Sequence, residues 1–398
     1  MIPSESLGIL EHDHELDHEG SPANRRSNAA TGASAAGMRA LSAQMIAFYF
    51  RAPVKAFFRT RVDYLAFARA INPRIAEGKW SFHTTTPGIL AHAVRTYGWQ
   101  FLPNQVLPPL LANTAVGAIL YTSYLQALAF LHEPTSRANK RTYPPPPPTD
   151  TFVAGFAAGT IQSVVAAPLD ALQVRLRTRD ILEGQYRSMW DYGRSKLREI
   201  GTRGIFAGWT LTFLRDALGN ALFFSCFEYV KAQAYYSFVR WYYGSLRPDQ
   251  KSKLSVGENP ESRPAIRPHY ALEPCFLMLA GLTASILQQT VQHPLGMIQS
   301  VHYGRLEYLD HQARQHPRRM MMRLYYHAYQ ETLKRCHKRA ERAGGWVKWL
   351  SRGFLVHTIR QVPSTSAGLV IFELVRRKYA NPADAVRIEK DGYDILLT

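Results

Sequence analysis

The chain has 398 residues, of which 46% are hydrophobic, and its formal net charge at pH 7 is +18. This length accommodates two or three soluble domains or one large membrane domain, and the basic charge suits nucleic acid, an anionic membrane surface or an anionic solute as partner. The three cysteines, Cys226, Cys275 and Cys336, lie far apart without a CxxC or metal-ligand spacing. The composition therefore predicts neither a disulfide framework nor a zinc site.

Residues 1–37 combine an acidic, histidine-rich tract with a run of small and polar residues. They contain neither a basic segment followed by an apolar core nor an arginine-rich amphipathic helix. We expect this part of the chain to be a disordered, solvated tail without a targeting signal.

Six long apolar segments follow, and each is interrupted by Gly, Ser, Thr, Gln or an occasional charge. They cover residues 38–58, 105–131, 151–174, 206–230, 275–303 and 354–375. This composition suits helices that turn one face to lipid and the other to a water-filled cavity. A soluble helical bundle gives a similar pattern over short windows, so the connections must discriminate between the two architectures.

The connections between these segments alternate between strongly basic and less charged. Those after the first, third and fifth segments are strongly basic, whereas residues 244–272 form a polar loop and residues 141–150 contain a stiff proline run. Alternate connections of a six-helix protein lie on one side of the membrane, where the positive-inside rule places basic residues. The pattern therefore favours a membrane protein and accounts for the basic charge without a nucleic-acid partner.

Internal repeats strengthen this interpretation. Gly155 and Gly281 each lie thirteen residues before a proline, Pro168 and Pro294, and a fainter copy of the same segment ends at Pro53. The fourth and sixth segments also align without a gap, pairing Gly208–Arg215 with Gly353–Arg360 and Phe227–Glu228 with Phe372–Glu373. Because glycine, charge and aromatic residues recur in phase, chance is a poor explanation.

This threefold repeat of two helices resembles the mitochondrial carrier family. Each repeat of that family has a Pro-x-Asp/Glu-x-x-Lys/Arg motif on its odd helix, a matrix helix, and an aromatic-acid-x-x-base motif on its even helix. The second repeat matches best, with Pro168, Asp170, Arg175 and the closing sequence FEYVK. The resemblance covers about residues 38–379. It implies an all-α membrane protein with six transmembrane helices in three pseudo-symmetric two-helix repeats and short matrix-side helices.

The expected organisation runs from a disordered tail to a C-terminal tail. Its parts are the N-terminal tail (1–37), repeat 1 (38–133), a Pro-rich linker (134–150), repeat 2 (151–240), a polar loop (241–272), repeat 3 (273–380) with a basic matrix insert (304–345), and the C-terminal tail (381–398).

The resemblance also gives physical roles to the motif residues. Pro53, Pro168 and Pro294 would kink the odd helices so that they converge and close the cavity. Small residues at Gly155 and Gly159 would let helices pack closely in lipid.

Gate ion pairs are expected from the motif charges that this chain retains. These are Asp170 and Lys55 on the matrix side, and Glu228, Lys231, Glu373 and Arg376 on the opposite side. Leu125 and Leu128 replace both charges in the first even helix, and Gln173 and Gln299 stand at basic positions of the odd-helix motif. Neither face can therefore form a complete ring of three pairs.

In the family, the substrate is held midway along the even helices. The matching residues are Asn113, Arg215, Asp216, Arg360 and Gln361. Arg215 would hold a carboxylate and Asp216 an amino group; the alternative is an internal ion pair that orients the helix. Arg360, which has no adjacent acid, is expected to bind an anion.

Polar side chains of the fifth segment remain open to two roles. Gln288, Gln289 and Gln292 either line the cavity or pack helices together.

The resemblance implies an alternating-access solute transporter, multi-pass in the mitochondrial inner membrane, for a small anionic or zwitterionic metabolite such as an amino acid or carboxylate. The alternative is a carrier-fold protein that no longer transports and serves as an interaction or structural component, with the outer membrane as a second location. We expect a monomer in contact with membrane lipids, cardiolipin among them, and no nucleic-acid partner. We expect no enzymatic activity, catalytic residue, cofactor or metal site.

Overall fold

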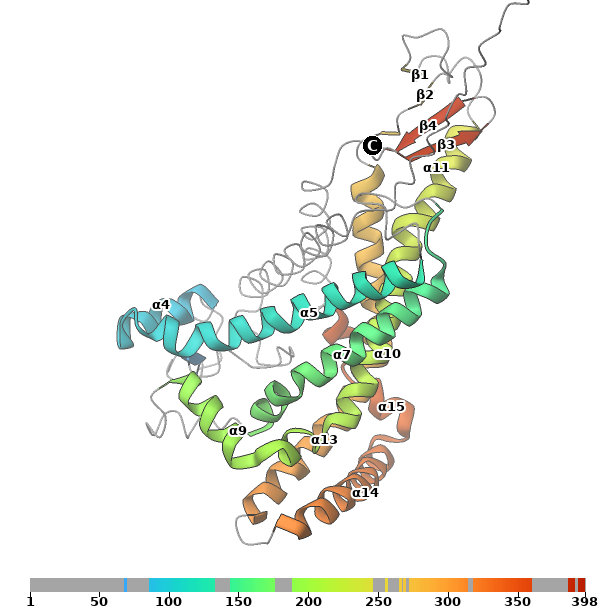
Figure 1. Cartoon of the computed structure of the whole chain (residues 1–398). Coiled ribbons are helices and arrows are strands. Elements are labelled where there is room, and N and C mark those ends of the chain that lie inside the picture. The colour runs from blue at the N-terminus through green and yellow to red at the C-terminus, as the bar shows by residue number, and fades with distance from the viewer. Residues whose placement is uncertain are drawn as a thin grey trace, which may run out of the picture.

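The computed structural model of the chain consists mainly of helices (Figure 1). It describes residues 68–69, 86–132, 144–175, 188–245, 255–256, 265–266, 268–269, 272–313, 318–359, 386–390 and 393–397. The predicted first segment, 38–58, and the sixth segment beyond residue 359 lie outside these residues. The six-helix, three-repeat arrangement therefore stays a prediction.

Each predicted apolar segment within the described residues forms a long helix. These helices are α5 (Leu107–Leu131), α7 (Pro148–Arg175), α10 (Trp209–Glu228) and α13 (Leu272–Ala313). The other helices are α4 (Thr86–Tyr97), α9 (Met189–Ile205), α11 (Tyr235–Gly244), α14 (Arg318–Ala343) and α15 (Trp346–Leu350). Two π-helical stretches continue the long helices: η2 (Leu102–Val106) leads into α5, and η3 (Tyr229–Ala234) joins α10 to α11.

Three of the described helices are long and apolar enough to cross a membrane. They cover Leu102–Leu131, Pro148–Leu172 and Leu272–Leu306. Large apolar side chains such as Val153 on α7 and Met278 on α13 are more than half exposed on their outer faces. A surface of this kind is typical of a helix that contacts lipid. The α10 helix is not one of these three, and it carries Arg215 and Asp216 in its middle.

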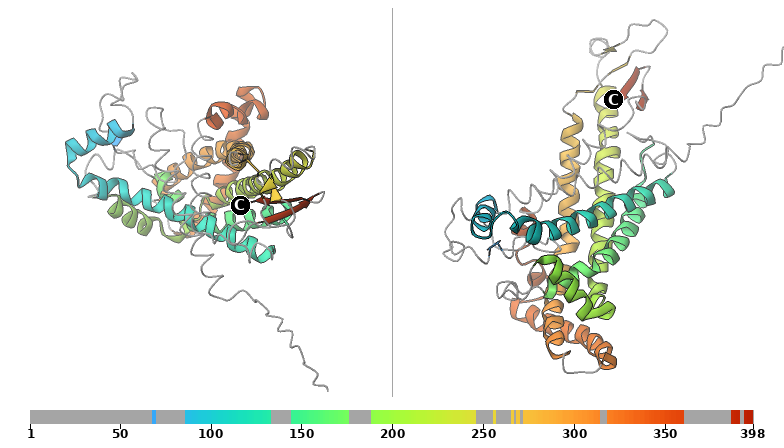
Figure 2. Two further views of the ribbon diagram at one scale, coloured as in Figure 1. Left: turned by 90° about the horizontal axis from the view of Figure 1, so that it is seen from above. Right: turned by 60° about the vertical axis from the view of Figure 1, so that its left-hand side comes forward.

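The helix α10 packs against both α7 and α13, and α5 packs on α7. In Figure 2, α10–α11 and α13 run side by side along the length of the molecule, and α5 crosses them obliquely. Gly155 and Gly159 lie where α7 meets α10: a Cβ atom at Gly159 would lie 2.6 Å from the carbonyl oxygen of Asp216. The expected role of these glycines in close helix packing is confirmed.

Pro168 and Pro294 both lie inside continuous helices. The α7 helix continues past Pro168 to Arg175, and α13 continues past Pro294 to Ala313. A proline removes only one intrahelical hydrogen bond, so neighbouring helices can hold the following turns in place. The proposed kinks at these two positions stay a prediction, and Pro53 lies outside the described residues.

A small sheet, which the sequence analysis did not predict, joins the polar loop to the C-terminal tail. Its strands are β1 (Ser255–Val256), β2 (Ala265–Ile266), β3 (Val386–Lys390) and β4 (Tyr393–Leu397), in the order β1-β2-β4-β3. The β3–β4 hairpin is antiparallel, and β4 pairs in parallel with β2 from the loop. Ile266 of β2 is fully buried against the aromatic face of α11. The hairpin was missed because its two strands are short and its pairing with β2 joins segments distant in sequence.

The Pro-rich linker also proves shorter than predicted, because α7 begins at Pro148. The preceding prolines lie against the η3 end of α10: Gln233 donates a hydrogen bond to the carbonyl oxygen of Pro146 at 2.9 Å. Ser225 likewise donates to the carbonyl oxygen of Pro148 at 3.1 Å. The proline run is therefore fixed to the helix that ends the second repeat.

The basic insert forms an antiparallel pair of helices at the other end of the molecule from the sheet (Figure 1). The α14 helix buries Ala328, Cys336 and Ala340 against α13, α15 and the start of α10. His302 of α13 stacks on Tyr329, and the hydroxyl of Tyr329 donates to the carbonyl oxygen of Ala207 just before α10. The insert thus holds the ends of α10 and α13 together.

Candidate functional site

Arg215 and Asp216, two neighbouring residues in the middle of α10, form a buried ion pair. Arg215 is 7% exposed and Asp216 is 2% exposed. The Nε atom of Arg215 donates to Oδ1 of Asp216 at 2.9 Å, and Nη2 donates to the same oxygen. Each charge is therefore neutralised within its own helix, as the internal-pair alternative expects.

The other terminal nitrogen of Arg215 reaches across to α13. Nη1 donates to Oε1 of Gln299 at 3.0 Å, and Nε2 of Gln299 donates to Oγ1 of Thr212 at 2.6 Å. The hydroxyl of Tyr303 lies 3.1 Å from that of Thr212 and also accepts a hydrogen bond from Gln299. Gln299 is fully buried. The guanidinium group is thus held by a hydrogen-bonded network between α10 and α13.

A second polar contact lies farther along α10 and joins three helices. Nδ2 of Asn220 donates to Oε1 of Gln162 on α7 at 2.8 Å, and Nε2 of Gln288 on α13 donates to Oδ1 of Asn220 at 3.2 Å. Gln292 packs against Gly219: a Cβ atom added to Gly219 would lie 2.5 Å from the side-chain amide nitrogen of Gln292. Of the two roles left open for the glutamines of α13, these contacts support helix packing for Gln288 and Gln292.

The predicted gate residues divide between described and undescribed parts of the chain. Asp170 is buried on α7, 4% exposed, and interacts electrostatically with Tyr303 of the network. Nζ of Lys231 lies 2.9 Å from Oε1 of Glu228. This pair joins two turns of one helical segment, whereas the expected links cross between repeats. Lys55, Glu373 and Arg376, which the cross-repeat links require, lie outside the described residues.

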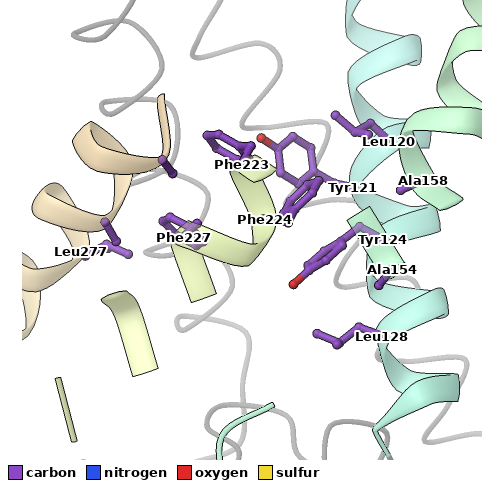
Figure 3. Close-up of a cluster of buried hydrophobic side chains, with 12 residues drawn as sticks. Leu120, Tyr121, Tyr124, Leu128, Ala154, Ala158, Phe223, Phe224, Phe227 and Leu277 are labelled. Atoms are coloured by element: carbon purple, nitrogen blue, oxygen red, sulfur yellow. The ribbon is translucent and has the colours of Figure 1, made fainter. Parts of the chain in front are cut away.

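An apolar cluster occupies the region where the first even helix lacks gate charges (Figure 3). The ring of Tyr124 on α5 stacks on Phe224 of α10, with ring centroids 3.8 Å apart, and Tyr121 meets Phe224 edge-on at 5.5 Å. Leu128 is 3% exposed in the same cluster, and Leu277 joins it from α13. Burial of such side chains stabilises a contact by about 1.5–3 kcal/mol each, against about 0–1 kcal/mol for an exposed ion pair.

The remaining predicted substrate contacts do not meet in the described residues. Asn113 is buried on α5, whereas the network around Arg215 is built from α10 and α13. Arg360 and Gln361 lie outside the described residues.

Sequence reasoning assigned no site role to three members of the network. Thr212, Gln299 and Tyr303 all contact the polar groups around Arg215. Gln299 could have been singled out from the sequence, because it places an amide where the repeat motif carries a base. The contact itself depends on how α10 and α13 cross.

Comparison with known proteins supports the resemblance to the mitochondrial carrier family that the sequence repeats indicate. Residues 144–237 match the family model for the mitochondrial carrier protein. Over these residues the chain is a member of the mitochondrial carrier family. The matched range contains α7, α9, α10 and η3 and overlaps most of the second repeat expected from the sequence, residues 151–240.

Individual relatives match this chain over parts of their length. A mitochondrial arginine transporter of Arabidopsis thaliana is 32% identical over 87 residues, which is 22% of this chain and 28% of the relative. A mitochondrial carnitine/acylcarnitine carrier-like protein of the same plant is 30% identical over 171 residues, 40% of this chain and 55% of the relative. A mitochondrial glycine transporter of Pyricularia oryzae is 33% identical over 99 residues, 25% of this chain and 28% of the relative. The chain thus spans between about a quarter and a half of the length of these relatives.

Proposed function

We propose that this carrier moves a small anionic or zwitterionic metabolite across the mitochondrial inner membrane by alternating access, with six spans in three repeats. The observation that carries the proposal is the buried Arg215–Asp216 pair in the middle of α10, between two helices long and apolar enough to span a membrane. An ionisable residue at the centre of a membrane helix costs about 2.5–3.5 kcal/mol on insertion scales. A cost of this kind is tolerated where the charges pair with each other, as they do here, and where they also serve to bind a solute.

The substrate class follows from the geometry of Arg215. A guanidinium group has five N–H donors in a planar fork. Three of them are engaged within the described residues, two by Asp216 and one by Gln299. The two that remain, one on each terminal nitrogen, suit the two oxygens of a carboxylate. Asp216 would then attract the amino group of the same solute.

The names of the three relatives agree with this class. Arginine, glycine and carnitine are chemically alike in carrying a carboxylate together with a cationic nitrogen. A carboxylate site beside an acid is the arrangement that a zwitterion of this kind requires. Arg360 and Gln361 are proposed as further contacts from the sixth helix, and Asn113 from the second.

The proposed orientation places the α14 end in the matrix and the sheet on the intermembrane-space side. Lys334, Lys338 and Arg342 are exposed along one side of α14. The positive-inside rule favours the matrix for such a helix, and anionic lipids such as cardiolipin suit its charge. The exposed apolar side chains of α7 and α13 would face the lipid tails.

Uptake into liposomes tests the function. Purified protein reconstituted into liposomes should take up radiolabelled glycine, arginine or carnitine faster than liposomes with heat-denatured protein. A thermal-shift screen of amino acids, carboxylates and nucleotides provides a binding measurement, since a ligand that binds only the folded state raises its apparent stability. Absence of both uptake and stabilisation across the panel would refute the proposal.

That negative result would favour the alternative, a carrier-fold protein that serves as an interaction or structural component. The specific observation on its side is the apolar cluster of Tyr124, Leu128 and Phe224, which fills a region where the family carries gate charges. In such a protein the cluster would hold the helices permanently together.

A further inference from the structure

Gln299 occupies a special place between the gate motif and the substrate site. It lies in the position that the odd-helix motif of the third repeat gives to a base, counted from Pro294. Its side chain is fully buried, and its amide oxygen accepts from Nη1 of Arg215 at 3.0 Å. The gate position of α13 therefore contacts the charged pair of α10 directly.

The orientation of this amide is set by its other partners. Its Nε2 atom donates to Oγ1 of Thr212 at 2.6 Å and to the hydroxyl of Tyr303. With the amide nitrogen directed at two hydroxyl groups, the amide oxygen must face the guanidinium group. The arrangement requires a neutral side chain that both donates and accepts, which a lysine or arginine at this position cannot do.

The contacts of Arg215 engage three of its five N–H groups within the described residues. Nε and Nη2 donate to Asp216, and Nη1 donates to Gln299. One N–H group remains on each terminal nitrogen. With partners on both sides, the guanidinium group cannot rotate without breaking a hydrogen bond.

We propose that Gln299 is a positioning and specificity residue, which holds Arg215 so that its remaining N–H groups meet the carboxylate of the solute. Because it is neutral, it adds neither a competing anion nor a repelling cation beside Arg215. The inference rests on the proposed function and names the group that the site selects, the carboxylate. A solute that lacks this group loses the contact with Arg215.

The decisive variant is Gln299→Glu, which keeps the shape of the side chain but places a carboxylate against Arg215. The new carboxylate occupies the guanidinium group, so the site should lose its preference for the carboxylate of the solute. The probes are two pairs that differ by this group, glycine with methylamine and arginine with agmatine. The matched control is Gln288→Glu, the same change on the same helix, at a residue that contacts Asn220.

The measurement is the concentration of each probe that gives half-maximal thermal stabilisation, repeated as competition against uptake in liposomes. For wild-type protein and Gln288→Glu, glycine and arginine should bind at least about tenfold better than their decarboxylated partners, since loss of one charge-assisted contact corresponds to about that factor. In Gln299→Glu this ratio should fall close to one or invert. Thr212→Val, which removes one partner of the Gln299 amide, should raise the half-maximal concentration severalfold and leave the maximal uptake rate nearly unchanged.

The outcomes separate this inference from the proposed function. If the wild-type protein binds and takes up none of the probes, the carboxylate site itself is refuted, and the role of Gln299 with it. If the wild type discriminates and Gln299→Glu keeps the same ratio, only the role of Gln299 is refuted. Equal loss of discrimination in Gln299→Glu and Gln288→Glu would show a general packing effect and also refute it. Should Gln299→Glu fail to fold, an unchanged half-maximal concentration in Thr212→Val refutes the inference.

Discussion

Substitution of Gly159 by alanine should separate the helices that carry the charged pair. A Cβ atom at this position would lie 2.6 Å from the carbonyl oxygen of Asp216 and 2.8 Å from the Cα atom of Ala217. Real Cβ atoms essentially never come closer than 3.0 Å to another heavy atom. Both neighbours are backbone atoms of α10, so no side chain can move aside, and α7 has to shift as a whole.

The size of the effect follows from two opposing contributions. Overpacking of a helix interface costs about 1–3 kcal/mol, while replacement of a helical glycine by alanine gains about 1 kcal/mol in helix propensity. Gly296→Ala is the matched control, because Gly296 also lies within a long helix and its added Cβ would meet no atom within 4 Å. The propensity gain is common to both variants, so their stabilities should differ by the overpacking cost of about 1–3 kcal/mol.

The assay is thermal unfolding of both purified variants in the same detergent. We expect Gly296→Ala to unfold at or above the wild-type temperature, and Gly159→Ala to unfold at least about 2 °C below Gly296→Ala. Liposome uptake by Gly159→Ala should also fall, because the nearest clash is with the peptide group of Asp216 itself. Identical unfolding temperatures for the two variants would refute the close approach of α7 to α10.

Three further predictions concern other parts of the molecule. Phe224→Ala should destabilise the protein by about 3–5 kcal/mol, because it empties the cluster around Tyr124, while Phe130→Ala, at an 89% exposed position, should change the unfolding temperature in detergent little. In a Cys226→Ser background, maleimide should label the exposed Cys275 within minutes and the buried Cys336 much more slowly. Burial raises the pKa of the Cys336 thiol, so less thiolate is present there at neutral pH. Equal labelling rates would contradict the packing of α14 on α13. Lys231→Ala should destabilise the protein by about 1–3 kcal/mol, because Glu228 is only 8% exposed and would lose the base that neutralises it; a loss below about 0.5 kcal/mol would contradict this pairing.

Local sequence patterns were sufficient to predict the long apolar helices α5, α7, α10 and α13. The apolar segments 151–174 and 275–303 became α7 and α13 because their composition favours helix whatever the neighbours are. The close helix contact at Gly155 and Gly159 was also predictable from the sequence, because residues four apart lie on one face of a helix.

Features that depend on distant parts of the chain were not predictable in the same way. The pairing of β4 with β2 joins residues 394–395 to 265–266, and no local pattern in either segment specifies that partner.

The site shows the same division. The repeat match identified Arg215 and Asp216, since both lie on one helix and their positions can be counted from a motif. The hydrogen bond from Arg215 to Gln299 could not be predicted from sequence positions, because it depends on how α10 and α13 cross. The role of Arg360 stays a prediction.

The central claim is that Arg215 binds the carboxylate of a transported solute, and uptake by Arg215 variants tests it most directly. Wild-type protein, Arg215→Ala, Arg215→Lys and the exposed control Arg323→Ala are reconstituted at equal amounts of folded protein, and initial uptake of the best solute of the panel is measured. We expect Arg323→Ala to match the wild type, Arg215→Ala to lose uptake, and Arg215→Lys to recover only part of it, because lysine keeps the charge without the planar fork. Uptake by Arg215→Ala at the wild-type rate would contradict the claim.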